Sequence, residues 1–266
     1  KKFADKDEIT VAALIMQNDF GKAYELGFNE FVKTSKVKIN FVFERIEPTA
    51  PTVTNQMPTL AAKNPDVFIA MTAGTSCTQA YTEAAENGLK TKAKYLFTGQ
   101  PCKGGAFVGK DKVGGDGSAS EGWWIAGGGN IDFNAAAYDN DPWVKWGRGL
   151  LAAKGIDYKS SSNFGQGFHY AWPFWQSVLT AAQLDGGLNR TNLMLAIRSI
   201  DMTNPNLISG IKFNLNGAVD GYPIEGSEFA KWDYKLQTWV QQGEVVELSG
   251  KSTNCAWDQT IGNCKP

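Results

Sequence analysis

The first hundred residues repeat one pattern three times: a strand-like apolar run, a small polar loop and a helix-like run. The apolar runs are ITVAALIM (9–16), VKINFVFERI (37–46) and VFIAM (67–71). Strands buried on both faces of a sheet read as continuous apolar runs, and parallel neighbours must be joined by long connections, usually helices. The pattern therefore predicts an α/β fold in which a parallel sheet is flanked by helices.

Three loops are the first places to look for function in such a fold. Ligands of open parallel sheets bind beyond the carboxyl ends of the strands. The loops that follow predicted strands there are 17–21, 72–77 and 99–103. Asp19 is the acidic residue in this set.

The charge balance argues against nucleic acid as a partner. The chain has 266 residues, 26 of them basic and 27 acidic, and a net charge of −1. No basic cluster interleaved with aromatic residues occurs. No apolar run approaches the roughly 20 residues that span a bilayer, and the opening KKFADKDE does not have the pattern of a signal peptide.

The four cysteines form two local pairs. Cys77 and Cys102 follow neighbouring predicted strands, so a disulfide between them is within reach, and Cys255 and Cys264 bracket a short terminal segment. Two disulfides would indicate an oxidising compartment. Four free thiols in a cytosolic protein are the alternative reading.

The character of the chain changes at a triple glycine, Gly127 to Gly129. A last strand-like run at 123–126 precedes it, and long helical patterns at 142–153, 168–184 and 189–200 follow it. Two strand-like runs, 229–236 and 238–248, come later. We therefore expect a domain change near residues 127–130.

Enzyme and metal signals are weak. No phosphate-binding glycine motif or Gly-x-Ser-x-Gly elbow occurs, and the cysteines lack metal-site spacing. The one histidine, His169, lies in an apolar helix and is interpreted as a packed core residue rather than a general base. Trp172 and Trp175 in the same helix favour core packing over sugar stacking. We expect no catalytic residue, no metal and no cofactor.

The order of these elements resembles the leucine/isoleucine/valine-binding group of periplasmic solute-binding proteins. The resemblance covers most of the chain and includes the helix opening at 18–22, the helix stop at 86–89 and the turn at 212–217. It implies two α/β lobes that close on a small ligand and deliver it to the membrane permease of an ABC transporter. Residues 1–128 and 229–266 would form the second lobe, and 129–228 the helical part of the first, crossing back near 210–228.

The resemblance also implies the ligand-binding residues. The aromatic residue after the first strand corresponds to Phe20, beside Asp19, and the loop after the third strand corresponds to Thr72, Ala73, Gly74 and Thr75. The acidic residue that receives an ammonium group in amino-acid binders corresponds to Gln100 or Pro101, and neither is charged. A buried ammonium without a carboxylate partner costs several kcal/mol, so a neutral or carboxylate-bearing ligand is favoured unless Asp19 substitutes.

The resemblance further implies a first-lobe sheet upstream of residue 9, so the chain is expected to have an incomplete first lobe. The apolar helix 168–184 would then need a cover, from an N-terminal segment, a second copy or the sheet of 9–98. The implied function is an exported, secreted or lipid-anchored, solute-binding component of an ABC transporter for an amino acid or a related carboxylate or aromatic compound. A ligand-sensing receptor domain of the same fold is the alternative.

Overall fold

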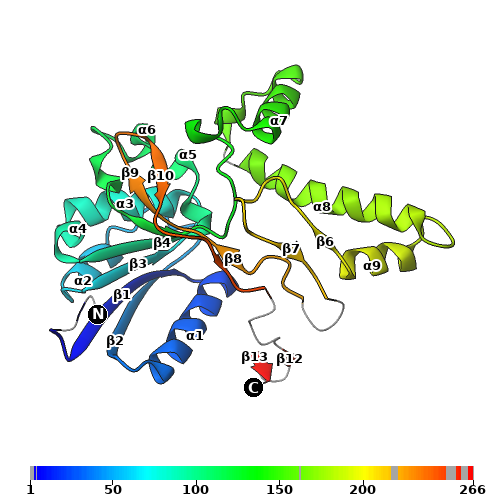
Figure 1. Cartoon of the computed structure of the whole chain (residues 1–266). Coiled ribbons are helices and arrows are strands. Elements are labelled where there is room, and N and C mark those ends of the chain that lie inside the picture. Colours follow the sequence, from blue (N-terminus) through cyan, green and yellow to red (C-terminus); the bar gives the residue numbers. More distant parts are fainter. Residues whose placement is uncertain are drawn as a thin grey trace. The chain divides into compact units, whose positions relative to one another are not determined.

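A computed structural model describes residues 3, 5–161, 163–216 and 221–249, together with the backbone of 256–258 and 263–265 (Figure 1). The contacts within the chain divide it into two units. The first, here called the sheet unit, comprises Lys1–Gly127, Asn134–Asp139 and Phe229–Gly243. The second, the helical unit, comprises Gly128–Phe133, Asn140–Glu228 and Glu244–Pro266.

The sheet unit is built on a seven-stranded sheet in the order β10-β9-β5-β4-β3-β1-β2. The first five strands in the sequence run parallel to one another. At one edge β9 pairs antiparallel with β5, and β10 pairs antiparallel with β9. The strands are β1 (Glu8–Met16), β2 (Lys38–Ile46), β3 (Val67–Met71), β4 (Tyr95–Gly99), β5 (Trp124–Ala126), β9 (Phe229–Asp233) and β10 (Thr238–Gln241). The predicted mostly parallel sheet is confirmed.

Helices cover the two faces of this sheet unequally. The helices are α1 (Asp19–Thr34), α2 (Gln56–Ala61), α3 (Thr75–Glu86), α4 (Leu89–Lys92), α5 (Gly105–Val108) and α6 (Lys110–Val113). Figure 1 shows α1 on one side of the sheet and α3 and α4 on the other. The main core lies on the α3 side, where Tyr81 and Trp123 pack edge to face with ring centroids 4.7 Å apart and both are fully buried.

Glycines explain where several elements stop. Helix α3 ends at Glu86, and Gly88 follows with a φ of 77°, a conformation that favours glycine because it has no Cβ. The predicted strand 238–248 is interrupted in the same way. Gly243 has a φ of 81° and separates β10 from β11 (Val246–Glu247), which pairs with β8 (Gly226–Ser227) in the helical unit. The contacts therefore group Glu244 to Ser249 with the helical unit, and the expected lobe of 1–128 and 229–266 stays a prediction.

One loop expectation needs correction. The loop after β3 is shorter than the predicted 72–77, because α3 begins at Thr75. The glycine-rich stretch 101–120 contains α5, α6 and two 3-10 turns, η1 (Gln100–Cys102) and η2 (Ser118–Ser120). Short helices of four residues have too few positions to show a helical period in the sequence.

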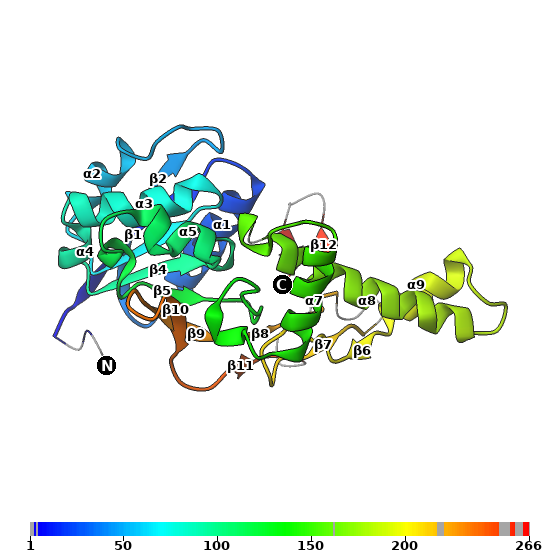
Figure 2. The ribbon, with the colours of Figure 1, turned by 90° about the horizontal axis from the view of Figure 1, so that it is seen from above.

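The helical unit contains α7 (Pro142–Ala153), α8 (Asn163–Gln183) and α9 (Arg190–Arg198), with β6 (Asp201–Met202) paired to β7 (Phe213–Asn214). Side chains cap two of these helices. The Asp141 carboxylate accepts a hydrogen bond from the Val144 amide at the start of α7, and Asn189 does the same for Asn192 at the start of α9. Figure 2 shows α8 and α9 side by side.

Helix α8 buries a narrow stripe of residues spaced four apart. These are Gly165, His169, Pro173, Ser177 and Ala181. The small residues of this stripe let Phe133 pack close to α8, since a Cβ on Gly165 would lie 2.6 Å from the Cβ of Phe133. The side chain of Asn204 donates to the His169 carbonyl at 3.1 Å and lies 3.4 Å from the imidazole Nδ1. Burial lowers the pKa of His169, which fits the predicted packed histidine.

The remaining circumference of α8 is largely apolar and open to solvent. Phe174 and Trp175 are 56% and 55% exposed, and helices α7 and α9 add Trp146 and Leu195 at 52% and 55%. Core packing of Trp175 is therefore not observed in this chain, whereas Trp172 packs on Trp143 with ring centroids 5.2 Å apart. Among the described residues, no helix combines the length and the apolar character needed to cross a membrane.

Candidate functional site

The carboxyl ends of β1, β3 and β4 are neighbours in the sheet, and the three predicted loops start there. At the end of β1 the chain turns at once into α1. The Asn18 carboxamide caps this helix by accepting a hydrogen bond from the Gly21 amide at 3.1 Å. Gly21 has no room for a side chain, because a Cβ there would lie 1.8 Å from the Met16 carbonyl oxygen. This close approach places Asp19 and Phe20 at the edge of the sheet.

Asp19 and Phe20 face different surroundings. Asp19 is exposed and lines a pocket of about 370 Å³ in which Arg45 is paired with Glu25 at 2.7 Å. The whole lining is Met16, Gln17, Asn18, Asp19, Lys22, Glu25, Leu26 and Arg45. Phe20 is half-buried, and its ring meets that of Tyr24 edge to face at 4.9 Å. The pocket beside Asp19 thus carries charges of both signs, whereas Phe20 offers an aromatic edge.

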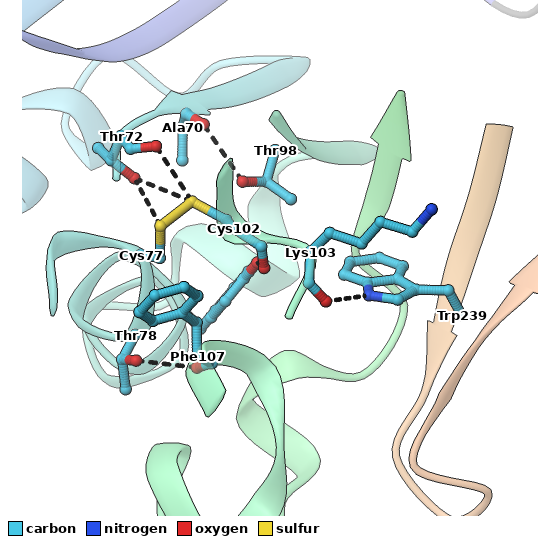
Figure 3. Close-up of a disulfide and its surroundings, with 10 residues drawn as sticks. Ala70, Thr72, Cys77, Thr78, Thr98, Cys102, Lys103, Phe107 and Trp239 are labelled. Atoms are coloured by element: carbon cyan, nitrogen blue, oxygen red, sulfur yellow. Dashed lines mark hydrogen bonds between the residues drawn. A yellow bond between two sulfur atoms is a disulfide. The ribbon is translucent and has the colours of Figure 1, made fainter. Parts of the chain in front are cut away.

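The loop after β3 divides into a buried and an exposed part. Thr72 is fully buried, and its hydroxyl oxygen lies 3.4 Å from the Cys102 sulfur and 3.8 Å from the Cys77 sulfur (Figure 3). Ala73 is half-buried, and Gly74 and Thr75 are exposed. Of these four predicted residues, Thr72 packs inside the loop against the disulfide, and the other three form the loop surface that solvent reaches.

A disulfide joins this loop to the next one. Cys77 in the first turn of α3 is bonded to Cys102 in η1, with the two Cα atoms 5.4 Å apart, as the sequence predicts (Figure 3). The Tyr81 hydroxyl donates to the Cys102 carbonyl at 3.2 Å, and burial raises the pKa of Tyr81. The bridge fixes the spacing of the β3 and β4 loops. The predicted Cys255–Cys264 pair lies outside the described residues.

The end of β4 carries neutral side chains. Gln100 is half-buried and opens η1, followed by Pro101, so neither residue brings a charge to the end of β4. Lys103 is 7% exposed, and its carbonyl accepts a hydrogen bond of 2.7 Å from the Trp239 indole on β10 (Figure 3). Among the described residues, no group of three or more His, Cys, Asp or Glu side chains is placed to hold a metal ion.

Tyr24 is a residue of this edge that sequence reasoning missed. It lies on α1, one turn after Phe20, and its hydroxyl reaches the end of β4. A methyl group placed on Gly99 would lie 3.8 Å from that hydroxyl oxygen and 3.4 Å from the Met71 sulfur. The four-residue spacing from Phe20 puts both rings on one face of a helix and was the available signal.

Comparison with known proteins identifies the fold through structural similarity, whereas the sequence comparisons find no match. No family model matches the chain, and no curated protein matches it. Many solved structures do match. A branched-chain amino acid ABC transporter protein from Thermus thermophilus with bound valine gives a TM-score of 0.74 at 13% identity and covers 91% of this chain and 62% of its own.

Two further structures differ in their ligands. A fatty acid ABC transporter substrate-binding protein from Thermomonospora curvata gives a TM-score of 0.69 at 16% identity, covering 93% of this chain and 60% of its own. An ABC transporter solute-binding protein from R. palustris in complex with 4-hydroxybenzoate gives 0.63 at 12% identity, covering 90% and 60%.

The chain spans about 60% of the length of these structures. Identities this low establish the fold and leave the ligand open. The fold itself is clear: a mostly parallel sheet flanked by helices, matched over nine tenths of the chain. The chain has the fold of the type I periplasmic binding proteins, to which the leucine- and valine-binding proteins of ABC transporters belong.

Proposed function

We propose that this chain is the solute-binding component of an ABC transporter and takes up a small organic ligand between two lobes, with the carboxyl edge of the β1, β3 and β4 strands as one wall. The observation that carries the proposal is the fold shared with solute-binding proteins together with three loops converging on that edge. The proposed contacts are Phe20, Ala73 to Thr75 and Gln100, with Asp19 at the margin. We assign no catalytic role to these residues.

The ligand class follows from the charges at the edge. Gln100 and Pro101 are neutral, so neither would supply a carboxylate partner to an ammonium group at the end of β4. A neutral or carboxylate-bearing compound with an aromatic or apolar body that packs on Phe20 fits better than a plain α-amino acid. Structural neighbours bind both kinds of ligand, valine and 4-hydroxybenzoate.

The proposed location is extracytoplasmic, in the periplasm or at the cell surface, by secretion or through a lipid anchor. The Cys77–Cys102 disulfide supports it, because disulfides persist in oxidising compartments. The proposed partner is a membrane permease. We also propose that the exposed apolar face of α8 is covered by an N-terminal segment of the same protein or by a second copy of the chain.

Calorimetric titration with a panel of small carboxylates, guided by native mass spectrometry of co-purifying compounds, tests the proposal. Phe20→Ala should weaken binding about 3- to 10-fold, because aromatic contact contributes about 0.5–1.5 kcal/mol beyond area burial. Phe31→Ala is the matched control, since Phe31 lies on the same helix and is 61% exposed. If Phe20→Ala and Gln100→Ala both bind like the unaltered protein, the proposed site is wrong.

A ligand-sensing receptor domain of the same fold is the second candidate. Solute uptake by cells separates the two. Deletion of the gene should abolish uptake of the ligand if the protein serves a transporter and leave uptake intact if it serves a sensor.

A further inference from the structure

Tyr24 connects two parts of the proposed site. Its ring packs edge to face on Phe20 at 4.9 Å, and its hydroxyl stands beside Gly99 at the end of β4, next to Gln100. The nearest atoms to a methyl group built on Gly99 would be the Met71 sulfur, a Pro101 ring carbon and the Tyr24 hydroxyl, at 3.4, 3.5 and 3.8 Å. The hydroxyl therefore lies at the edge where the proposed ligand would sit.

The Tyr24 hydroxyl is not used by the fold. Within the described part of the chain it has no hydrogen-bond partner, and the Gln100 carboxamide has none either. Burial raises the pKa of Tyr24, so the phenol stays protonated at neutral pH and remains a donor. Because Tyr24 is only half-buried, its hydroxyl can also be reached from solvent, so an acceptor on a ligand can take its hydrogen bond.

Packing requires the ring of Tyr24 and not its oxygen. The rings of Phe20, Tyr24 and Phe28 form a row along α1, and Phe28 continues it to Phe41 on β2 at 5.4 Å. Phenylalanine would serve equally at position 24 in that row. The Tyr24 hydroxyl is therefore not needed for this packing and is available to bind a ligand.

We propose that Tyr24 is a ligand-binding residue that donates a hydrogen bond to an oxygen acceptor, a carboxylate or a carbonyl, on a ligand whose apolar body packs against Phe20. This inference rests on the proposed function and narrows its ligand class. The Gln100 carboxamide is the second neutral group within this edge and can donate to the same acceptor. Both groups are neutral, so neither balances the charge of an ammonium group, whereas each can donate a hydrogen bond to an acceptor.

The test uses the full chain labelled with carbon-13 in its tyrosine rings and two probes of similar size, benzoate and benzylamine. Benzoate should shift the Tyr24 ring resonances with saturation, and benzylamine should not. Tyr24→Phe should raise the dissociation constant of benzoate about tenfold, the loss expected for one hydrogen bond to a charged group.

Tyr95→Phe is the matched control. Tyr95 is the first residue of β4, at the opposite end of that strand from Gly99, and its ring packs against that of Phe3. Benzoate affinity should therefore not change in this variant. If Phe20→Ala and Gln100→Ala weaken benzoate binding while Tyr24→Phe does not, the role of Tyr24 is refuted and the proposed function stands. Absence of any benzoate-induced shift at Tyr24, together with no detectable benzoate binding by calorimetry, refutes both. Tighter binding of benzylamine than of benzoate refutes the acceptor class.

Discussion

At the scale of single residues, His169 is the group whose protonation should affect stability near neutral pH. Burial holds its pKa below the ordinary 6.5 in the folded protein. The unfolded chain therefore binds a proton first as the pH falls, so the free energy of unfolding should decrease from about pH 6.5 down to the folded pKa. Above pH 6.5 this contribution should be constant. Urea unfolding at several values between pH 5 and 7.5 measures it.

The control for this prediction is His169→Gln, which should flatten the pH dependence in that window. The Asn204 carboxamide that donates to the residue 169 carbonyl keeps that contact in the variant. Parallel pH profiles for the two proteins would contradict the assignment to His169.

At the scale of secondary-structure elements, the start of α1 shows how closely this helix is held against the sheet. A Cβ on Gly21 would lie 1.8 Å from the Met16 carbonyl oxygen and 2.7 Å from a methyl carbon of Ile15. Gly21→Ala should therefore lower the free energy of unfolding by at least about 2 kcal/mol, the usual order of cost for overpacking. Gly27→Ala in the same helix should raise it by about 0.5–1 kcal/mol, because nothing lies within 4 Å of its Cβ position and alanine is the better helix former.

Thermal or chemical unfolding followed by circular dichroism compares these two alanine variants directly. Equal stabilities would show that the amino end of α1 is not packed against the end of β1. Because the same turn carries Phe20, Gly21→Ala should also disturb ligand binding, whereas Gly27→Ala should not.

At the scale of the whole molecule, the exposed apolar face of the helical unit should determine how the protein behaves in solution. Phe174 and Trp175 are both more than half exposed, and such patches promote association. Light scattering should detect self-association of the chain, and an apolar dye should bind it. Trp175→Lys should reduce both signals and change the free energy of unfolding by only about 0.5 kcal/mol, because more than half of the Trp175 surface already faces water.

A monodisperse monomer that binds no apolar dye would show that this face needs no cover. Trp123→Lys is the contrasting variant. Trp123 is fully buried, so the charge should destabilise the sheet unit strongly rather than change association.

Much of the sheet was predictable from the sequence because its signals are local. The apolar run of β3, Val67–Met71, is observed with the predicted bounds, and β1 begins one residue earlier than predicted. Parallel strands place their carboxyl ends on one edge, so the neighbourhood of Phe20, Thr75 and Gln100 follows from strand order. The same rule predicted the Cys77–Cys102 disulfide, since both cysteines follow adjacent strands.

The tertiary structure decided what depends on distances between elements. Whether the Tyr24 hydroxyl reaches Gly99 depends on how α1 lies over the sheet, and whether Thr72 faces solvent or the disulfide depends on the packing of α3. The exposure of Phe174 and Trp175 is also a property of the assembled fold. Residue periodicity indicates that a helix has an apolar face, but it carries no information about which surface, if any, packs against that face.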